Sequence, residues 1–321
     1  MDEVGRERKA VLITGARGFI GRAVCRLLQR EGYEVIGVDC AADSGTAAHL
    51  PSERELVLDI TDAEQLRALF QSRAIGGIIH LAAILPTAAK RDPVLATRVN
   101  VQGSLNVLEM AREFGVRRRV VFGSSLSVYG TCPAQRVVSE LDRAAPEDLY
   151  GAAKLYVEHI GAAYRELHAL EFVSLRIGRV VGPGARSATS AWRSEIFELL
   201  RASDPAEIVL PYAGWESVLL VHVDDVARML LSLLSVERPD HCVYNACCEA
   251  VRVEELKAHI EALNGNVSVR LGEAEVVGNP RQVDSSRFSG EFGFKTAPIF
   301  EQMVAAARGS GRASRDRRST I

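Results

Sequence analysis

The sequence predicts an α/β fold in which a doubly wound parallel sheet is followed by a smaller α/β region. In the first half of the chain, short strands that are apolar on both faces alternate with helical patterns, as in a parallel sheet covered by helices on both sides. A glycine-rich segment follows the first strand and opens the first helix. After Gly182 the pattern becomes less regular, and this change marks the second region.

The strands of the expected sheet are the apolar segments of the first half, at 10–14, 33–39, 55–59, 76–82, 118–125 and 172–178. The helices between them are expected at about 18–30, 61–72, 93–115 and 149–168. In the second half we expect a loop at 182–190, helices at about 191–202 and 223–234, and strands near 207–210, 217–223 and 242–246. Residues 1–178 would form the sheet domain. Residues 179–307 would supply most of a C-terminal substrate-binding region, with some segments returning to the sheet, and the basic end 308–321 would be a disordered tail.

The composition excludes several classes of protein. The chain has 321 residues, 25% charged residues and a formal net charge of −2, so nothing indicates a nucleic-acid or anionic-membrane partner. No apolar run is long enough to span a bilayer, and the charged N-terminal segment is not typical of a signal peptide. The six cysteines include no CxxC pair, which predicts free thiols, no metal site and a cytoplasmic protein.

The glycine-rich segment 14–21 reads TGARGFIG and has the spacing GxxGxxG, with glycines at Gly15, Gly18 and Gly21. Glycines there allow a tight turn, a close approach of the backbone to a pyrophosphate, and close packing of the helix on the strand. The free N–H groups at the start of the helix then face the phosphates. Because a strand precedes the segment and a helix follows it, the segment predicts a Rossmann-type dinucleotide site.

Side chains near the ends of the strands indicate which dinucleotide binds. Asp39 ends the second strand, where its carboxylate would accept hydrogen bonds from the adenosine ribose hydroxyls and repel a 2′-phosphate. Arg17 argues in the other direction, because a guanidinium in the glycine-rich segment could hold that phosphate. We weigh these residues in favour of NAD over NADP. Asp59 and Ile60 could flank the adenine, or could serve only as a strand end and a helix cap.

A second motif, Tyr150-Gly-Ala-Ala-Lys154, lies at the start of a predicted helix. The separation of four residues places Tyr150 and Lys154 on one face of that helix. A free tyrosine has a pKa of about 10, and a nearby ammonium and a cationic nicotinamide would lower it toward the range of a general base. Ser125, at the end of a strand, could donate a hydrogen bond to the substrate oxygen, and Ser124 and Ser127 compete for this role.

These segments resemble the extended short-chain dehydrogenase/reductase family, which includes NAD-dependent epimerases and dehydratases. The resemblance covers about residues 10–305 and rests on segments 14–21, 80–83, 124–130, 150–154, 175–176 and 223–225, and on Asn100. It implies a Rossmann-type core, a bound nicotinamide dinucleotide and a homodimer built on two core helices. It also implies that Ser125, Tyr150 and Lys154 form the catalytic set, with Tyr150 as the acid/base and Lys154 as a ligand of the nicotinamide ribose.

The same resemblance implies roles for further residues, as cofactor contacts or as part of the core. The additional cofactor contacts that it implies are Phe19, Ile20, Leu81, Ala82, Ala83 and Asn100. His80 could be read as catalytic, but the family pattern places it at the end of the fourth strand, so we expect a structural role.

Members of this family are nucleotide-sugar epimerases, dehydratases or simple dehydrogenases. Epimerases that resemble this chain usually carry an arginine that grips the nucleotide diphosphate, where this chain has Val218; Arg179, Arg186 or Arg193 could compensate. Dehydratases usually place an acidic residue after the catalytic serine, where this chain has Leu126. Other segments are similar to short-chain-type L-threonine dehydrogenases and to uronate dehydrogenases.

The leading hypothesis is an NAD-dependent dehydrogenase that acts on a secondary alcohol of a small polar substrate, such as a hydroxy acid, a sugar acid or a sugar, with an anionic substrate favoured. The candidate substrate contacts, in addition to Ser125, are Leu85, Thr87, Arg179, Thr189, Ser190 and Trp192. The alternative is a nucleotide-sugar epimerase that uses transient oxidation. A non-catalytic NAD(H)-sensing scaffold is the third hypothesis, and the intact catalytic set argues against it.

Overall fold

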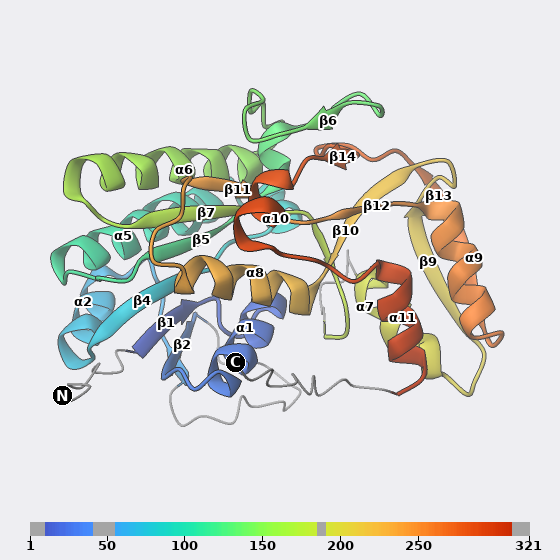
Figure 1. Cartoon of the computed structure of the whole chain (residues 1–321), viewed down its shortest axis with the longest axis horizontal. Helices are drawn as coiled ribbons and strands as arrows, with labels where there is room; N and C mark the ends of the chain where they lie inside the picture. Colours follow the sequence, from blue (N-terminus) through green and yellow to red (C-terminus); the bar gives the residue numbers. More distant parts are fainter. Residues whose placement is uncertain (1–9, 41–54, 185–190, 310–321) are drawn as a thin grey trace, which may run out of the picture.

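The computed structural model of the chain describes residues 10–40, 55–184 and 191–309 (Figure 1). Its centre is a seven-stranded sheet in which every neighbouring pair is parallel. The strands in spatial order are β11 (Val243–Asn245), β7 (Phe172–Ile177), β5 (Val120–Ser125), β4 (Ile75–His80), β1 (Ala10–Thr14), β2 (Val35–Asp39) and β3 (Glu55–Val57). The predicted doubly wound parallel sheet is therefore confirmed.

The order of the strands reverses at β1. From β1 the chain moves outward through β2 to β3, and it then returns to β4 on the other side of β1 and continues outward through β5 and β7. At such a reversal the loops that follow the two central strands diverge, and ligands of open α/β sheets bind in the resulting crevice at the carboxyl ends of the strands. This reversal locates the candidate site.

Helices cover both faces of the sheet. Helices α1 (Phe19–Arg30) and α8 (Val223–Ser235) pack together on one face. The other face carries α2 (Ala63–Ser72), α5 (Ser104–Glu113) and α6 (Leu149–His168) (Figure 1). All residues of β1, β4 and β5 are buried because helices enclose the sheet from both sides.

The long helix predicted over about 93–115 is divided into three segments. It consists of α4 (Pro93–Thr97), a π-helical segment η1 (Arg98–Gly103) and α5, and the short helix α3 (Pro86–Arg91) precedes it. Within η1, the Asn100 side chain bonds the backbone of Ile84, and the Ser104 hydroxyl donates to the Asn100 carbonyl at 2.7 Å. The spacing of apolar residues could not reveal the π segment. One of these contacts reaches Ile84, which lies outside the helix, and the other joins polar groups within one turn.

The second region contains a separate core. Strand β10 (Ser217–His222) pairs in parallel with β8 (Arg179–Val181) and antiparallel with β12 (Glu249–Arg252), while β9 (Ala206–Tyr212) pairs in parallel with β13 (Val267–Ala274). The helices of this region are α7 (Trp192–Glu198), η3 (Leu199–Arg201), α9 (Val253–Leu263) and α11 (Ile299–Ala307). Strand β8 was not predicted, because only Gly178 separates its three residues from β7. The domain boundary at about residue 178 stays a prediction.

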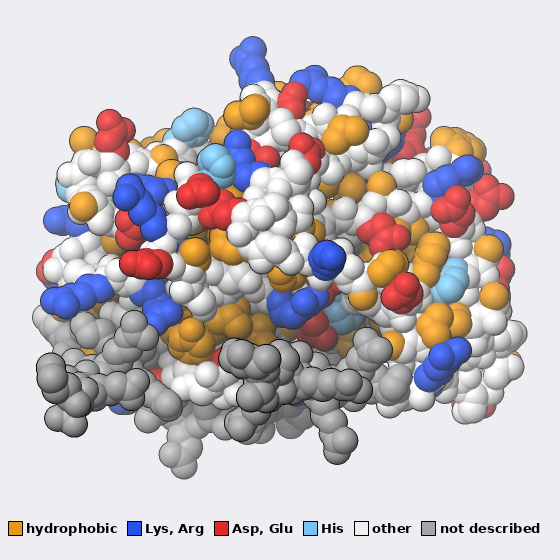
Figure 2. Space-filling view, in the orientation of Figure 1, with side chains coloured by type: hydrophobic (Ala, Val, Ile, Leu, Met, Phe, Trp, Pro, Cys, Tyr) orange, Lys and Arg blue, Asp and Glu red, His pale blue; other side chains and the backbone are white. Residues whose placement is uncertain are grey.

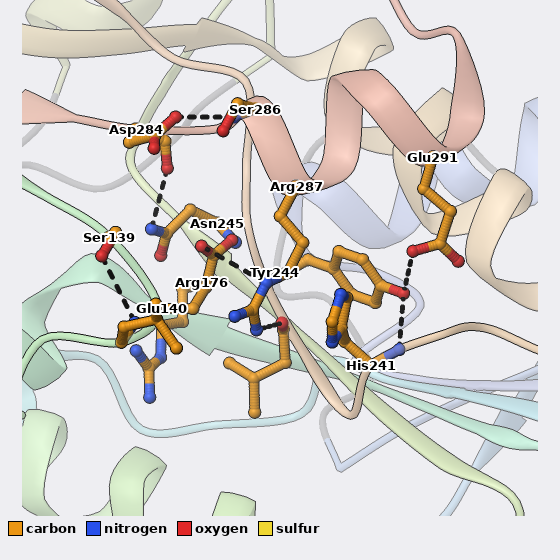
Figure 3. Close-up of polar contacts among 12 residues, drawn as sticks. Ser139, Glu140, Arg176, His241, Tyr244, Asn245, Asp284, Ser286, Arg287 and Glu291 are labelled. Atoms are coloured by element: carbon orange, nitrogen blue, oxygen red, sulfur yellow. Dashed lines mark hydrogen bonds and ion pairs between the residues drawn. The ribbon is translucent and has the colours of Figure 1, made fainter.

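Strand β11 returns to the edge of the large sheet and is held there by polar contacts from Glu140 and from the C-terminal part of the chain (Figure 3). The Asn245 N–H donates to Glu140 Oε1 at 2.6 Å, and its amide nitrogen donates to the carbonyl of Asp284 at 3.0 Å. The Tyr244 hydroxyl donates to Glu291 of α10 (Ser286–Phe292) at 2.6 Å. A small parallel pair, β6 (Val137–Val138) with β14 (Gln282–Val283), connects the same segments.

The surface in Figure 2 carries side chains of both charge signs without a large patch of one sign. Among the helices described, none is both long and apolar enough to cross a membrane.

A close contact between α6 and β7 provides a test of the packing. A Cβ atom added at Gly161 would lie 2.2 Å from Cζ of Phe172, so we expect Gly161→Ala to lower the free energy of unfolding by about 1–3 kcal/mol. Gly290 in α10 is the control, since nothing lies within 4 Å of its added Cβ, and Gly290→Ala should stabilise by roughly 0.5–1 kcal/mol. Urea unfolding measures both effects, and equal effects of the two substitutions would contradict this packing.

Candidate active site

The glycine-rich segment between β1 and α1 forms a tight backbone cradle. Gly15 has φ 70°, and a Cβ there would lie 2.8 Å from the backbone nitrogen of Ala82. A Cβ at Gly21 would lie 2.1 Å from the carbonyl oxygen of Gly15. Because the glycines let the turn close under the helix N-terminus, the segment fits the pyrophosphate of a dinucleotide.

Hydrogen bonds fix the loop after β4 against this cradle. The Thr14 hydroxyl accepts from the N–H groups of Leu81 and Ala82, each at 3.2 Å. The Asn100 amide oxygen accepts from the Ile84 N–H at 2.7 Å, and its nitrogen donates to the Ile84 carbonyl at 3.0 Å. Asn100 therefore holds the loop that carries residues 81–84, and its direct contact with a cofactor stays a prediction.

The predicted adenosine contacts lie at the ends of β2 and β3. One carboxylate oxygen of Asp39 accepts from the Arg17 N–H at 3.0 Å, so the carboxylate is fixed next to the glycine-rich segment. Asp59 accepts from the Thr61 N–H at 2.8 Å. Ile60 is buried, and its side chain fills the space beside Gly103. Phe19 and Ile20 begin α1 and are partly buried against the core.

Strand β5 and helix α6 bring Ser125, Tyr150 and Lys154 together. Asp148 caps α6 by accepting from the Gly151 N–H at 2.7 Å, which fixes the start of the helix beside Tyr150. The Ser125 hydroxyl lies beside the Tyr150 side chain, where hydrogen bonding to it lowers the pKa of the tyrosine, and it accepts from the hydroxyl of Ser127 at 2.9 Å. Ser124, one of the alternatives for the catalytic serine, instead donates to Glu158 at 2.5 Å. This arrangement leaves Ser125 as the hydroxyl next to the tyrosine.

Lys154 lies deeply buried beside this pair. Its ammonium nitrogen donates to the carbonyl of Gly123 at 2.7 Å and lies 5.5 Å from the centroid of the Tyr150 ring. Burial lowers the pKa of Lys154 to about 7, although the charge of Glu158 opposes this shift. The ammonium form is therefore much less strongly favoured here than in water.

Burial has the opposite effect on the tyrosine. It raises the pKa of Tyr150 to about 12, the charge of Asp148 adds to the increase, and Ser125 and Arg193 oppose it. The sequence predicted a lower pKa because it revealed the nearby lysine but not the loss of solvent. In the chain alone Tyr150 is therefore protonated at neutral pH and can donate a proton.

A buried ion pair next to the catalytic set was not identified as such from the sequence. The Arg176 guanidinium bonds both oxygens of Glu158, with 2.7 Å for the shortest contact, and donates to the Tyr129 hydroxyl at 2.8 Å. Glu158 raises the pKa of Arg176, so this guanidinium stays charged. The available signal was an arginine within the apolar strand 172–178, since a buried cation requires a partner.

His80 is placed in the core, as expected. Its Nδ1 lies 2.6 Å from the Thr14 hydroxyl and its Nε2 lies 2.9 Å from the Ser104 hydroxyl, so both ring nitrogens are occupied. Burial lowers the pKa of His80 to about 3, and the charge of Lys154 adds to this decrease. The neutral ring joins β1, β4 and α5.

The candidate substrate contacts differ in how exposed they are. Leu85 is exposed ahead of α3, which carries Thr87, while Arg179 is buried on β8. Trp192 is 5% exposed and packs within the core of the second region, and its expected role as a direct substrate contact stays a prediction. The remaining candidates, Thr189 and Ser190, and also Arg186, lie outside the described residues. No group of three or more His, Cys, Asp or Glu side chains that could hold a metal occurs in residues 10–40, 55–184 and 191–309.

The sheet, the reversal at β1 and the glycine cradle define a dinucleotide-binding α/β enzyme. A family model, described as the NAD dependent epimerase/dehydratase family, matches residues 11–247. The chain belongs to this family.

Curated relatives include both epimerases and reductases. The chain is 28% identical to UDP-glucuronate 4-epimerase of Thermodesulfobacterium geofontis, over 70% of this chain and 71% of that protein. It is 30% identical to dTDP-4-dehydro-6-deoxy-D-allose reductase of a Streptomyces species, over 94% of this chain and 95% of that protein. Matches to the UDP-glucuronate 4-epimerases 4, 3 and 2 of Arabidopsis thaliana span less than half the length of those proteins.

Solved structures share the fold over nearly the whole chain. The UDP-glucose 4-epimerase of Thermus thermophilus, solved in complex with NAD, has a TM-score of 0.77 at 26% identity and covers 94% of this chain and 99% of its own. The L-threonine dehydrogenase of Clostridium difficile has a TM-score of 0.81 at 22% identity and covers 94% of this chain and 98% of its own. At that identity the second match shows the fold alone.

The buried, neutral His80 makes stability depend on pH. Its pKa is lower in the folded chain than in the unfolded chain, so stability is lost as pH falls below about 6.5, and between pH 7 and pH 5 the loss is about 2 kcal/mol. In His80→Asn this part of the loss should disappear. Urea unfolding of both proteins at the two pH values measures the difference, and equal pH dependence would contradict a neutral, buried histidine.

Proposed function

We propose that the chain is an NAD-dependent dehydrogenase that transfers a hydride between a secondary alcohol of a small polar substrate and NAD. The observation that carries this proposal is the juxtaposition of Ser125, Tyr150 and Lys154 at the carboxyl edge of the sheet that also bears the glycine cradle. Membership of an NAD-dependent family supports the choice of cofactor.

In this proposal the glycine-rich segment holds the pyrophosphate and the Asp39 carboxylate holds the adenosine ribose. Lys154 lies close enough to Tyr150 to bind a ribose hydroxyl and to favour the phenolate when it carries a charge. When bound, NAD supplies the acceptor for the hydride. The loop at residues 81–84, fixed by Thr14 and Asn100, forms the adjoining wall.

The proton is the part of the reaction that this chain's own residues handle. In the oxidation of an alcohol, the Tyr150 phenolate takes the hydroxyl proton while Ser125 donates a hydrogen bond to the same oxygen. In the reverse direction, Tyr150 returns the proton to the carbonyl oxygen. Because burial raises the pKa of Tyr150, its resting form is the proton donor, and nearby cations are needed for it to act as the base.

A nucleotide-sugar epimerase is the second candidate, favoured by the 4-epimerases among the similar proteins. It would use the same Tyr150 and return the hydride to the opposite face of the substrate. One feature of β10 weighs against it. Val218 is buried at the position where an arginine was expected to grip a nucleotide diphosphate.

We further propose a cytoplasmic homodimer. Support comes from exposed apolar side chains on neighbouring helices, namely Val94 and Leu95 on α4 and Leu149 on α6. Apolar surface on adjacent helices is typical of a contact between subunits. Light scattering after size-exclusion chromatography measures the mass, and a monomer at micromolar concentration would contradict the dimer.

Tyr150→Phe tests the role of the tyrosine. The substitution should lower turnover by about 10²- to 10⁴-fold, because no proton acceptor remains, while NAD binding is retained. Tyr156→Phe is the control, since Tyr156 lies on the same helix and is 52% exposed. NADH absorbance reports turnover and calorimetry reports NAD binding. Full activity of Tyr150→Phe would overturn the mechanism and support a non-catalytic NAD(H)-binding scaffold.

The two candidate functions differ in whether they form NADH as a net product. A dehydrogenase should form one NADH for each alcohol oxidised in a screen of hydroxy acids, sugar acids and nucleotide sugars. An epimerase would interconvert sugar epimers with no net NADH. Absorbance at 340 nm together with product stereochemistry separates them, and epimer exchange without NADH would overturn the dehydrogenase.

A further inference from the structure

We propose that Arg179 and Arg193 together bind a carboxylate of the substrate beside Tyr150. The inference rests on the proposed function and narrows its substrate class to hydroxy acids and sugar acids. Arg179 lies on β8 and Arg193 on α7, two elements of the second region that pack together. The Gly182 N–H donates to the Arg193 carbonyl at 3.0 Å, which fixes the start of α7 against the end of β8.

Both guanidinium groups have buried nitrogen atoms without partners. Arg179 is 8% exposed, and its Nε donates to the Tyr212 hydroxyl at 3.1 Å, but its Nη1 makes no hydrogen bond. The Nε of Arg193 is likewise buried and makes none. Unsatisfied donors of this kind are costly in a folded protein, so they indicate a missing acceptor.

Aromatic rings hold the two guanidinium groups without neutralising them. The Cζ of Arg179 lies 5.4 Å from the centroid of the Tyr212 ring, and that of Arg193 lies 5.9 Å from the Trp192 ring. The two rings meet edge to face at 6.1 Å. Trp192 therefore supports Arg193 from within the core of the second region.

The charge of the pair is not balanced by the chain. Burial and the neighbouring Arg179 both lower the pKa of Arg193. Two other arginines of the interior have carboxylate partners, Arg176 with Glu158 and Arg281 with Glu216. Arg119 is buried without a carboxylate partner, but its Nη2 donates to two backbone carbonyls. Within the described residues no acidic side chain forms an ion pair with Arg179 or Arg193, so an external anion is the natural partner of both.

The position of the pair selects the kind of anion. Ile177 pairs with Ser125 in the large sheet, and Arg179 follows Ile177 by two residues, so Arg179 lies at the same edge of the sheet as the catalytic set. The charge of Arg193 lowers the pKa of Tyr150, which agrees with this placement. An anion bound there lies close to the alcohol that Tyr150 serves, as the carboxylate of a hydroxy acid does. A guanidinium fork fits a carboxylate or a phosphate oxygen pair, so the test must separate these two sources.

The test measures the binding of simple anions to the NAD-loaded protein by calorimetry. Malonate represents a carboxylate, and inorganic phosphate represents the phosphate of a nucleotide sugar. Arg179→Met and Arg193→Met should each weaken malonate binding tenfold or more and leave NAD binding unchanged. Arg252→Met is the matched control, because Arg252 is an exposed arginine of the same region with a carboxylate partner.

Thermal unfolding without added anion distinguishes binding from a structural role. Replacing an unpaired buried cation with an apolar side chain of similar length should leave the Tm unchanged or raise it. A lower Tm in both variants, or malonate binding equal to that of the unchanged protein, would overturn the proposal. Phosphate binding tighter than malonate binding would overturn the carboxylate assignment.

The experiments distinguish a failure of the anion site from a failure of the proposed dehydrogenase function. Tyr150→Phe should retain malonate binding while it loses turnover. If NADH forms from neutral secondary alcohols as readily as from hydroxy acids, the carboxylate site fails while the dehydrogenase stands. If malonate binds as expected but no alcohol yields NADH, the dehydrogenase fails while the anion site stands.

Discussion

The buried ion pair between Arg176 and Glu158 is the interaction on which the site depends. It joins β7 to α6, and the Ser124 hydroxyl adds β5 by donating to the same carboxylate at 2.5 Å. Ser124 immediately precedes Ser125, and Glu158 follows Lys154 by one helical turn. The same contacts that bury this pair therefore fix the distance between the serine and the helix that carries Tyr150. Loss of one partner would leave an uncompensated charge in the core, at a cost of about 3–5 kcal/mol.

The contrast with Arg179 and Arg193 explains how one chain uses buried arginines in two ways. Each guanidinium nitrogen of Arg176 donates to a carboxylate or hydroxyl group of the chain, so this arginine stabilises the fold. Arg179 and Arg193 are held by aromatic rings and keep donors free. Their positive charge is costly in the empty chain and becomes favourable only when an anion arrives.

The exclusion of water from the site governs the chemistry of the catalytic set. Burial raises the pKa of Tyr150 and lowers that of Lys154, so it disfavours the charged form of each side chain. Charges that enter the site, together with Arg193 and the Ser125 hydroxyl, act against this effect. In a poorly solvated site each such interaction is stronger than it would be in water, and the proton affinity of Tyr150 becomes sensitive to what is bound.

The sequence by itself determined the parallel sheet, the glycine cradle and the pairing of Tyr150 with Lys154. These features arise from local spacing: two-sided apolar strands, three glycines in one turn, and two side chains one helical turn apart. The sequence also predicted that some segments of the second region return to the sheet. Only the tertiary structure decided that β11 is such a segment, that Trp192 is buried, and that the Trp192 ring beside Arg193 meets the Tyr212 ring. These outcomes depend on contacts between segments far apart in the chain, and no local pattern records them. The same holds for the pKa of Tyr150, because solvent is excluded by the whole fold rather than by the residues next to it.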